Sequence, residues 1–179
     1  MKNMLKFIVL SMSIFFVQQG CRKLGLCEDG EFNFPRQENT SNKIRLNGYY
    51  YGDLTGNNPS TPSVYLLYKD GISYSGLGSY NIKEIEDNSL VLSITDDKRN
   101  SKSGWGIYKI ENNSIEIQNW SFSTDCKPIT ILEGDILNDT TIKISSWKNS
   151  NSDKQHIVNS IFLFHEYSPK PDSTNNFIK

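Results

Sequence analysis

The sequence predicts an all-β domain: an antiparallel up-and-down β-barrel of eight to nine strands with one short helix, placed after an export signal and a polar tether. Beyond residue 43, apolar and polar residues alternate in short runs, as they do in half-buried strands. Turn-forming pairs such as Asp70-Gly71 separate these runs. Such short connections favour hairpins between consecutive strands, and closure into a barrel would leave no exposed strand edge.

Residues 1–20 have the pattern of an export signal. Lys2 and Lys6 give the start a positive charge, and residues 7–17 form an apolar run interrupted by two serines. As a helix this run would reach about 16 Å, whereas the hydrocarbon core of a bilayer is about 30 Å thick. A secretory signal is therefore predicted in preference to a membrane span.

The signal ends in Gln18-Gln19-Gly20-Cys21, which resembles a lipobox, the motif after which lipoprotein signal peptidase cleaves. The resemblance implies that residues 1–20 are removed and that Cys21 becomes an N-terminus carrying acyl chains such as palmitate. The alternative is an ordinary secretory signal that leaves Cys21 as a thiol. Residues 21–43 are polar and rich in turn formers, and they are expected to tether the folded domain to the membrane.

The barrel domain is expected to cover residues 44–167. Its first half is predicted from periodicity and turns. Asp70-Gly71 between β-rich runs is a strong hairpin signal. Asn81 followed by Glu84 has the spacing of a capping box and predicts the start of a short helix. The elements expected here are strands over residues 44–50, 64–69 and 72–80, a helix within 81–92, and loops over 53–63 and 96–103.

The second half is predicted to contain two more hairpins and a long last strand that pairs back on the first. Asn112-Asn113 and Asn138-Asp139 tolerate the positive φ that tight hairpin turns need. Pro169 and Pro171 end the last strand. The elements expected here are strands over residues 105–110, 115–120, 129–137, 141–147 and 156–167, followed by a C-terminal tail over 168–179.

Alternation predicts which side chains fill the barrel, because alternate residues of a strand share a face. Ile142 and Ile144 are expected to be buried. For two strands the pattern allows either face to point inward, so each has two alternative sets of inward residues. These sets are Trp105 with Ile107 or Gly106 with Tyr108, and Ile161 with Leu163 or Phe162 with Phe164.

Four segments support a resemblance to known proteins. They are Leu46-Asn47-Gly48-Tyr49-Tyr50, Gly104-Trp105-Gly106-Ile107-Tyr108-Lys109-Ile110, Glu133-Gly134-Asp135-Ile136-Leu137-Asn138-Asp139-Thr140-Thr141 and Lys170-Pro171-Asp172-Ser173-Thr174-Asn175. In this order they resemble small exported bacterial lipoproteins of uncharacterised function that have a lipocalin-like, or calycin, β-barrel. The resemblance implies a fold and a location more than an activity.

Charge and cysteine content limit the partners. Removing Lys2 and Lys6 with the signal leaves 17 basic and 20 acidic residues, a net charge of 17 minus 20, or −3. Without a basic stripe, nucleic acid is not expected as a partner. If Cys21 carries lipid, Cys27 and Cys126 remain, and an oxidising compartment would let them form a disulfide that ties the tether to one end of the barrel. The alternative is two unpaired thiols.

No catalytic or metal-binding motif is found. His156 and His165 lie nine residues apart on one predicted strand, and an odd separation sends them to opposite faces. No Gly-x-Ser-x-Gly, P-loop or HExxH pattern occurs. Carboxylate groups such as Asp96-Asp97 lie in polar surroundings, which would not tune them for catalysis. We therefore expect no enzyme activity, no cofactor and no metal.

Aromatic residues are the best candidates for contact with a ligand or partner. Tyr49, Tyr50 and Tyr51 are consecutive, so they cannot all face one core; Tyr49 and Tyr51 are expected to be exposed, and Trp105 is a third candidate contact. The alternative is that these rings belong to the barrel core and its rim.

Together these patterns predict a lipid-anchored β-barrel of the cell envelope with a binding or structural role. The membrane is the expected partner of lipidated Cys21, most simply the outer membrane, with the barrel facing the periplasm or the cell surface. A small apolar ligand in a hollow barrel, or an envelope protein, would be the second partner. The alternative is a surface interaction module, such as an inhibitor of a cell-wall-degrading enzyme, which a filled barrel interior would favour.

Overall fold

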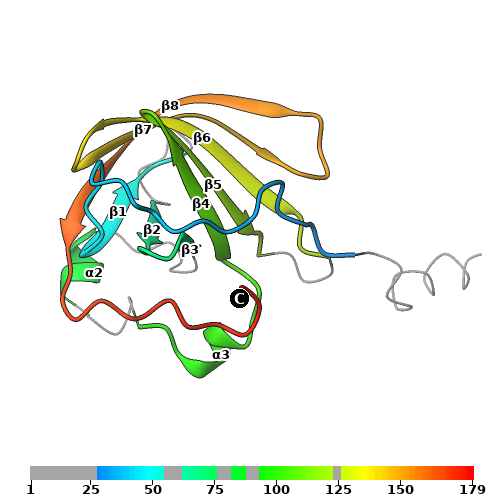
Figure 1. Ribbon diagram of the computed structural model, residues 1–179, viewed down its shortest axis with the longest axis horizontal. Coiled ribbons are helices and arrows are strands. Elements are labelled where there is room, and N and C mark those ends of the chain that lie inside the picture. The colour runs from blue at the N-terminus through cyan, green and yellow to red at the C-terminus, as the bar shows by residue number, and fades with distance from the viewer. Residues whose placement is uncertain (1–27, 55–61, 76–81, 88–92, 123–125) are drawn as a thin grey trace, which may run out of the picture.

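Eight strands form one closed antiparallel barrel in the computed structural model, which describes residues 28–54, 62–75, 82–87, 93–122 and 126–179 (Figure 1). Each strand pairs with the next, and the last pairs with the first. The strands are β1 (Gly48–Gly52), β2 (Ser63–Leu67), β3 (Ile72–Tyr74), β4 (Trp105–Glu111), β5 (Ser114–Trp120), β6 (Ile129–Asn138), β7 (Thr141–Asn149) and β8 (Gln155–Glu166). Two short helices, α2 (Ile82–Asp87) and α3 (Asp96–Arg99), lie between β3 and β4.

The predicted hairpins and the predicted closure are confirmed. Gly71 has a φ of 82° in the turn between β2 and β3, and Asn112 has a φ of 56° between β4 and β5. Tyr50 pairs with Tyr65 on β2 and with Phe164 on β8, which joins the two ends of the sheet. The helix expected within residues 81–92 is α2.

Three differences from the expected elements exceed one or two residues at a strand end. The first strand begins at Gly48 and not at residue 44, because the chain before it packs Ile44 into the barrel interior. The segment 96–103, expected to be a loop, contains the single helical turn α3, and Asn100 caps its end with a backbone N–H to Asp96 O. β3 ends at Tyr74, and most of the strand predicted beyond it, residues 76–80, lies outside the described residues.

The barrel interior is filled by large apolar side chains. Tyr108 on β4 and Phe162 on β8 pack in the interior cluster, whereas Trp105 packs in a separate cluster outside the wall. This decides both open alternatives: Gly106 with Tyr108, and Phe162 with Phe164, face inward. Ile161 and Leu163 on the other face of β8 are 43% and 50% exposed. The interior cluster contains Ile44, Tyr50, Tyr65, Leu67, Tyr108, Ile115, Ile117, Leu132, Ile136, Ile142, Ile144 and Phe162.

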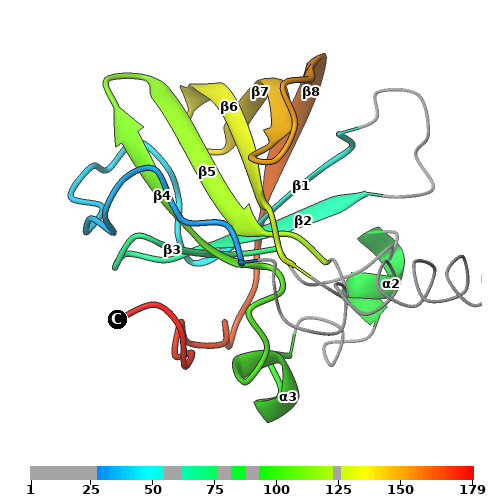
Figure 2. The same cartoon turned by 90° about the vertical axis from the view of Figure 1, so that its right-hand side faces the viewer.

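A second apolar layer covers the outside of β1 to β4. Trp105 and Tyr74, which pair across β3 and β4, pack there with ring centroids 4.6 Å apart. Ile85 of α2 and Ile94 before α3 are buried in the same layer. α2, α3 and the C-terminal residues all lie on this side of the barrel, beneath β1–β3 (Figure 2). The wall of the barrel is thus buried on both faces in this region.

The segment before β1 lies along the barrel wall, which differs from the tether expected over residues 21–43. Gly30 N–H donates to Lys127 O before β6, and Phe32 packs on Trp120 at the end of β5. Asn39 N–H donates to Lys69 O in the turn after β2. Ile44 then enters the interior cluster at the opposite end of the barrel. We call residues 28–47 the strap; Figure 1 shows it crossing in front of β4.

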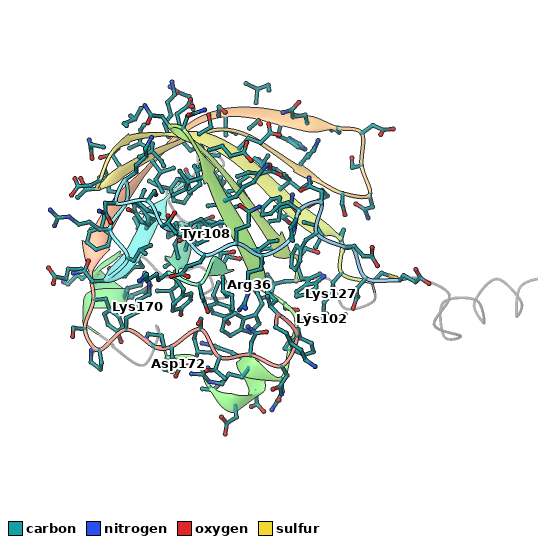
Figure 3. All side chains as sticks on the ribbon, in the orientation of Figure 1. Arg36, Lys102, Tyr108, Lys127, Lys170 and Asp172 are labelled. Carbon is teal, nitrogen blue, oxygen red and sulfur yellow. The ribbon has the colours of Figure 1, made fainter. Side chains whose placement is uncertain are left out.

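The C-terminal residues after β8 are held by buried polar contacts. Lys170 Nζ donates to Leu46 O and to Leu67 O, both at 2.6 Å, and lies 4.3 Å from the centre of the Tyr68 ring. Arg99 of α3 binds Asp172 with both guanidinium nitrogens, at 2.9 and 3.3 Å. Figure 3 shows Lys170 and Asp172 at the two ends of this attachment. The tail therefore joins β2, the strap and α3.

The export signal, Cys21 and Cys27 lie outside the described residues. Within the described part of the chain, no helix has both the length and the apolar character that a membrane crossing needs.

We predict that Ile144→Asp prevents folding, because Ile144 is 2% exposed inside the barrel and a carboxylate there would have no partner. The expected loss of stability exceeds about 4 kcal/mol. Circular dichroism and denaturant unfolding provide the measurement. Ile161→Asp on the outer face of β8 is the matched control and should fold. A soluble Ile144→Asp protein with an unchanged midpoint would contradict the assignment of this face.

We also predict that stability rises between pH 8 and pH 9 through Lys170. Burial lowers the pKa of Lys170 from 10.5 to about 8, so the folded protein releases this proton before the unfolded chain does. Unfolding then takes up a proton in this range, and the free energy of unfolding increases with pH. Lys170→Met should remove this slope, whereas the exposed control Lys154→Met should keep it.

The midpoint of denaturant unfolding measured at several pH values tests this prediction. The series stops at pH 9 because buried tyrosines, which ionise near pH 10 in the unfolded chain, act in the opposite direction above it. Burial raises the pKa of Tyr74 to about 12, so the unfolded chain ionises first and stability falls. Equal slopes in the wild type and Lys170→Met would refute the role given to Lys170.

Candidate binding site at the barrel mouth

The middle of the barrel holds almost no free space. The cavity enclosed by the interior side chains has a volume of about 10 Å³, which is about the room of one water molecule. Its lining residues are Tyr50, Tyr65, Leu67, Ile117, Leu132, Ile142, Ile144 and Phe162. The far end is closed by Ile44 and by Tyr50, whose hydroxyl donates to Asp139 O at 3.1 Å. A ligand the size of a small metabolite therefore has no room inside.

Free space opens at the other end, where β1 ends and β2 begins. Two adjoining depressions lie there, of about 300 and about 720 Å³, and Ser63 and Thr130 line both of them. These volumes fall in the range of about 300–1,000 Å³ that is typical of ligand sites. We call this region the mouth.

One side of the mouth is polar and is built on β2, β5 and β6. Asn119 at the end of β5 is 2% exposed; its Nδ2 donates to Ser73 Oγ at 3.1 Å and to Gly104 O at 2.7 Å. Its Oδ1 lies buried in the lining without a hydrogen-bond partner, as does Ser121 Oγ two residues on. An unpartnered buried oxygen is costly, so this side of the mouth offers hydrogen bonds that the protein does not use.

The position of Asn119 depends on a glycine across the sheet. Gly106 pairs with Asn119, and a Cβ added to Gly106 would lie 2.6 Å from Asn119 Nδ2 and 1.9 Å from Gln118 O. Any other residue at Gly106 would displace the amide. The sequence Gly104-Trp105-Gly106 therefore places Trp105 in the outer layer and leaves room inside for Asn119.

The other side of the mouth is apolar and aromatic and is built on β7 and β8. Trp147 and His156 pair across these strands, and their rings stack with centroids 4.1 Å apart and planes inclined by 4°. Leu54 after β1 and Val158 on β8 complete this side. The stack fixes the orientation of both rings, and it gives the mouth a planar aromatic surface.

Among the residues that the structure describes, the lining of the mouth contains no Asp, Glu, Lys or Arg side chain. Tyr65 lies at its floor, and burial raises the pKa of this phenol, so it stays neutral at physiological pH. The mouth thus combines unpartnered oxygens with aromatic surface, and a charged ligand would find no ion pair within the lining.

Two other depressions have a different character. One, of about 610 Å³, lies between the strap, β4, β5 and the C-terminus, and it is lined by residues of both charges, including Asp29, Arg36 and Lys102. The other, of about 300 Å³, lies on the outer wall around Lys109, Glu116 and Asp135. Both lie on the outer surface, between side chains that already form ion pairs such as Lys102 with Asp29.

The aromatic residues proposed from the sequence lie outside the mouth. The expectation that Tyr49 is exposed is wrong: it is 2% exposed and stacks on His165 in the outer layer, with centroids 5.3 Å apart. Trp105 is fully buried, and its Nε1 donates to Lys98 O at 2.9 Å. Tyr51 is half-buried beside His165. These rings hold α3 and the C-terminal residues against the barrel.

His156 and His165 face opposite sides of the barrel wall, as their odd separation predicts: the first lies in the mouth and the second in the outer layer. Among the described residues, no group of three or more His, Cys, Asp or Glu side chains could hold a metal ion.

The strap enters the structure at the mouth end. Asp29 accepts a hydrogen bond from Lys127 N at 3.0 Å and forms an ion pair with Lys102 Nζ at 2.8 Å. These contacts hold the pKa of Asp29 below its usual value, and Figure 3 shows Lys102 and Lys127 at this point. Lys127, which binds Asp29, directly follows Cys126 in the sequence, and Asp29 lies two residues after Cys27. Cys27 itself lies outside the described residues.

Trp147 and Asn119 were not among the residues proposed from the sequence. Register shifts beside Ser145 reverse the alternation of β7, so that Ile144 and Trp147 both point inward while Ser146 points outward to Glu133. Alternation alone would place Trp147 on the outer face. Asn119 could have been found, because it shares the inward face of β5 with Ile115 and Ile117.

Comparisons with protein-family models, with curated proteins and with solved structures found no match.

Proposed function

We propose that this chain is a lipid-anchored binding protein of the cell envelope, which takes its ligand or partner at the mouth. The observation that carries the proposal is the contrast between a filled interior and an open, uncharged mouth with unpartnered buried oxygens at Asn119 and Ser121. Binding sites are commonly found in the mouths of β-barrels. The resemblance to lipocalin-like lipoproteins supports an envelope location.

The filled interior changes the binding mode that was expected of a hollow barrel. A hollow barrel would enclose a small apolar ligand, whereas the interior here is packed around about 10 Å³ of space. A ligand would therefore sit across the opening, between Trp147 on β7 and Asn119 on β5, and part of it would face solvent. Recognition of one group of a larger molecule suits this arrangement.

The anchor would place the mouth on the membrane side. Cys21 is seven residues before Glu28, where the described strap begins, and seven residues extend at most about 25 Å. Such an anchor leaves the opposite end of the barrel free for a partner, which does not suit a site at the mouth. A site at the mouth would instead meet its ligand in the space between the membrane and the barrel.

A surface interaction module, such as an inhibitor of a cell-wall-degrading enzyme, is the second candidate. The filled interior favours it, because such a module needs no cavity. Its contact surface would be the two loops predicted over residues 53–63 and 96–103. The second contains α3 and is fixed by Arg99 to Asp172, and residues 55–61 of the first lie outside the described part.

Hydrogen exchange with and without solubilised envelope material tests the proposed site. Binding at the mouth should protect amides at the end of β5 and in the β7–β8 hairpin, and Trp147→Ala should abolish that protection. Protection confined to α3 and the loop around it would favour the surface module. Protection confined to the outer wall of β6 to β8 would refute both candidates.

We predict that Cys21→Ser releases the protein from membranes or leaves its signal uncleaved. The reason is that stable anchoring needs more than one acyl chain, and Cys21 is the proposed site of these chains. Fractionation of cells and mass spectrometry of the mature N-terminus provide the measurement. Ser41→Ala in the strap is the control and should stay with the membrane. An unmodified N-terminus on the wild-type protein would refute the anchor.

We further predict a disulfide between Cys27 and Cys126. The contacts of Asp29 and Gly30 with Lys127 support it, because they bring the two chain segments together. Peptide mapping without reductant, on protein made in an oxidising compartment, should recover the two cysteines in one cross-linked peptide. Two separately alkylated thiols would mean that the strap is held at this end by non-covalent contacts alone.

A further inference from the structure

We propose that the ligand of the mouth is a neutral carbohydrate, with a sugar ring bound between Trp147 and the polar side formed by Asn119 and Ser121. This inference rests on the proposed function, because it names the ligand class for the same site. Three properties of the mouth support it: its lack of charge, its unused hydrogen-bonding groups and its rigid aromatic surface.

The absence of Asp, Glu, Lys and Arg from the described lining of the mouth disfavours most other small ligands. Phosphates, carboxylates and ammonium groups lose water when they bind, and they need an opposite charge or a dense set of hydrogen bonds in return. Anionic sugars, nucleotides and amines are therefore disfavoured, and a neutral polar ligand is favoured.

The hydrogen-bonding groups suit a ligand that has hydroxyls. Asn119 Oδ1 can only accept, whereas Ser121 Oγ can both donate and accept, and neither has a partner. Ser63 and Thr130 add hydroxyls along the line where the two depressions meet. A sugar presents adjacent hydroxyls that each donate and accept, so it suits a lining that offers both acceptors and donors.

The aromatic side suits the apolar face of the same ring. A pyranose carries C–H groups on one face and hydroxyls around its edge, so it packs on an aromatic surface while its edge makes hydrogen bonds. Trp147 is fixed by its stack on His156, which lowers the entropy cost of ordering it on binding. Leu54 and Val158 extend this apolar surface. A peptide would use the polar groups but would gain less from a flat, rigid surface.

Binding to immobilised sugars tests the proposal directly. The probes are neutral hexose and N-acetylhexosamine oligosaccharides, with uronic-acid and phosphorylated oligosaccharides and a library of neutral peptides for comparison. The strongest neutral sugar is then measured by calorimetry, both free in solution and as the headgroup of a glycolipid in phosphatidylcholine vesicles. Tighter binding to the vesicle identifies a lipid headgroup as the source, and equal binding identifies a free glycan.

Two variants test the site itself. Trp147→Ala should weaken sugar binding at least about tenfold, and Ser121→Ala about three- to tenfold, as expected for one lost hydrogen bond. Ser121 Oγ has no partner in the protein, so its removal breaks no hydrogen bond of the fold. Ser160→Ala is the matched control, because it removes another unpartnered buried hydroxyl that does not line the mouth.

The outcomes separate the sugar assignment from the proposed site. Neutral sugar binding that both mouth variants weaken and Ser160→Ala leaves unchanged supports the proposal. Equal binding of anionic sugars, or sugar binding that neither mouth variant affects, overturns it. Peptides that bind and are lost with Trp147→Ala overturn the sugar assignment while the mouth remains the site. Failure of every probe class, together with no protection at the mouth by envelope material, overturns both.

Discussion

The pairing of β8 with β1 is the contact on which the rest of this structure depends. It joins residues more than a hundred positions apart, such as Tyr50 and Phe164, and it turns a meander of hairpins into a closed wall. Closure leaves no free sheet edge and fixes one inward face for all eight strands. The interior then fills with the largest side chains of that face, among them Tyr50, Tyr108 and Phe162.

A filled interior places the chemistry at the ends of the barrel. Ile44 closes one end, and the strap continues from it into β1. At the other end the inward-facing residues become smaller and more polar, through Ser73, Asn119 and Thr130. The loss of side-chain volume leaves an opening there, and the mouth is therefore a consequence of packing as much as of loop structure.

Much of the fold could be predicted from the sequence, because tight turns and period-two patterns are local signals. The turns at Gly71 and Asn112 and the last strand show this. The strap could not be predicted, because its polar residues resemble a tether and only the wall beside them gives Phe32 and Ile44 a place to pack. The burial of Tyr49 and Trp105 likewise depends on α2, α3 and the tail, which cover the wall from outside.

The path of the strap determines how the barrel would respond to a mechanical load. A pull on the chain before residue 28 would act first on Asp29 and Gly30 at the mouth end, whereas the strap joins the sheet at Gly48, at the far end. With Cys27 and Cys126 reduced, its contacts would open one after another while the closed wall stayed intact, and residues 28–44 would release up to about 55 Å of extended chain. With the two cysteines joined, the load would pass from Cys27 directly to the segment before β6, and the strap would keep its place. The oxidation state of this pair would thus decide whether the strap lengthens under load.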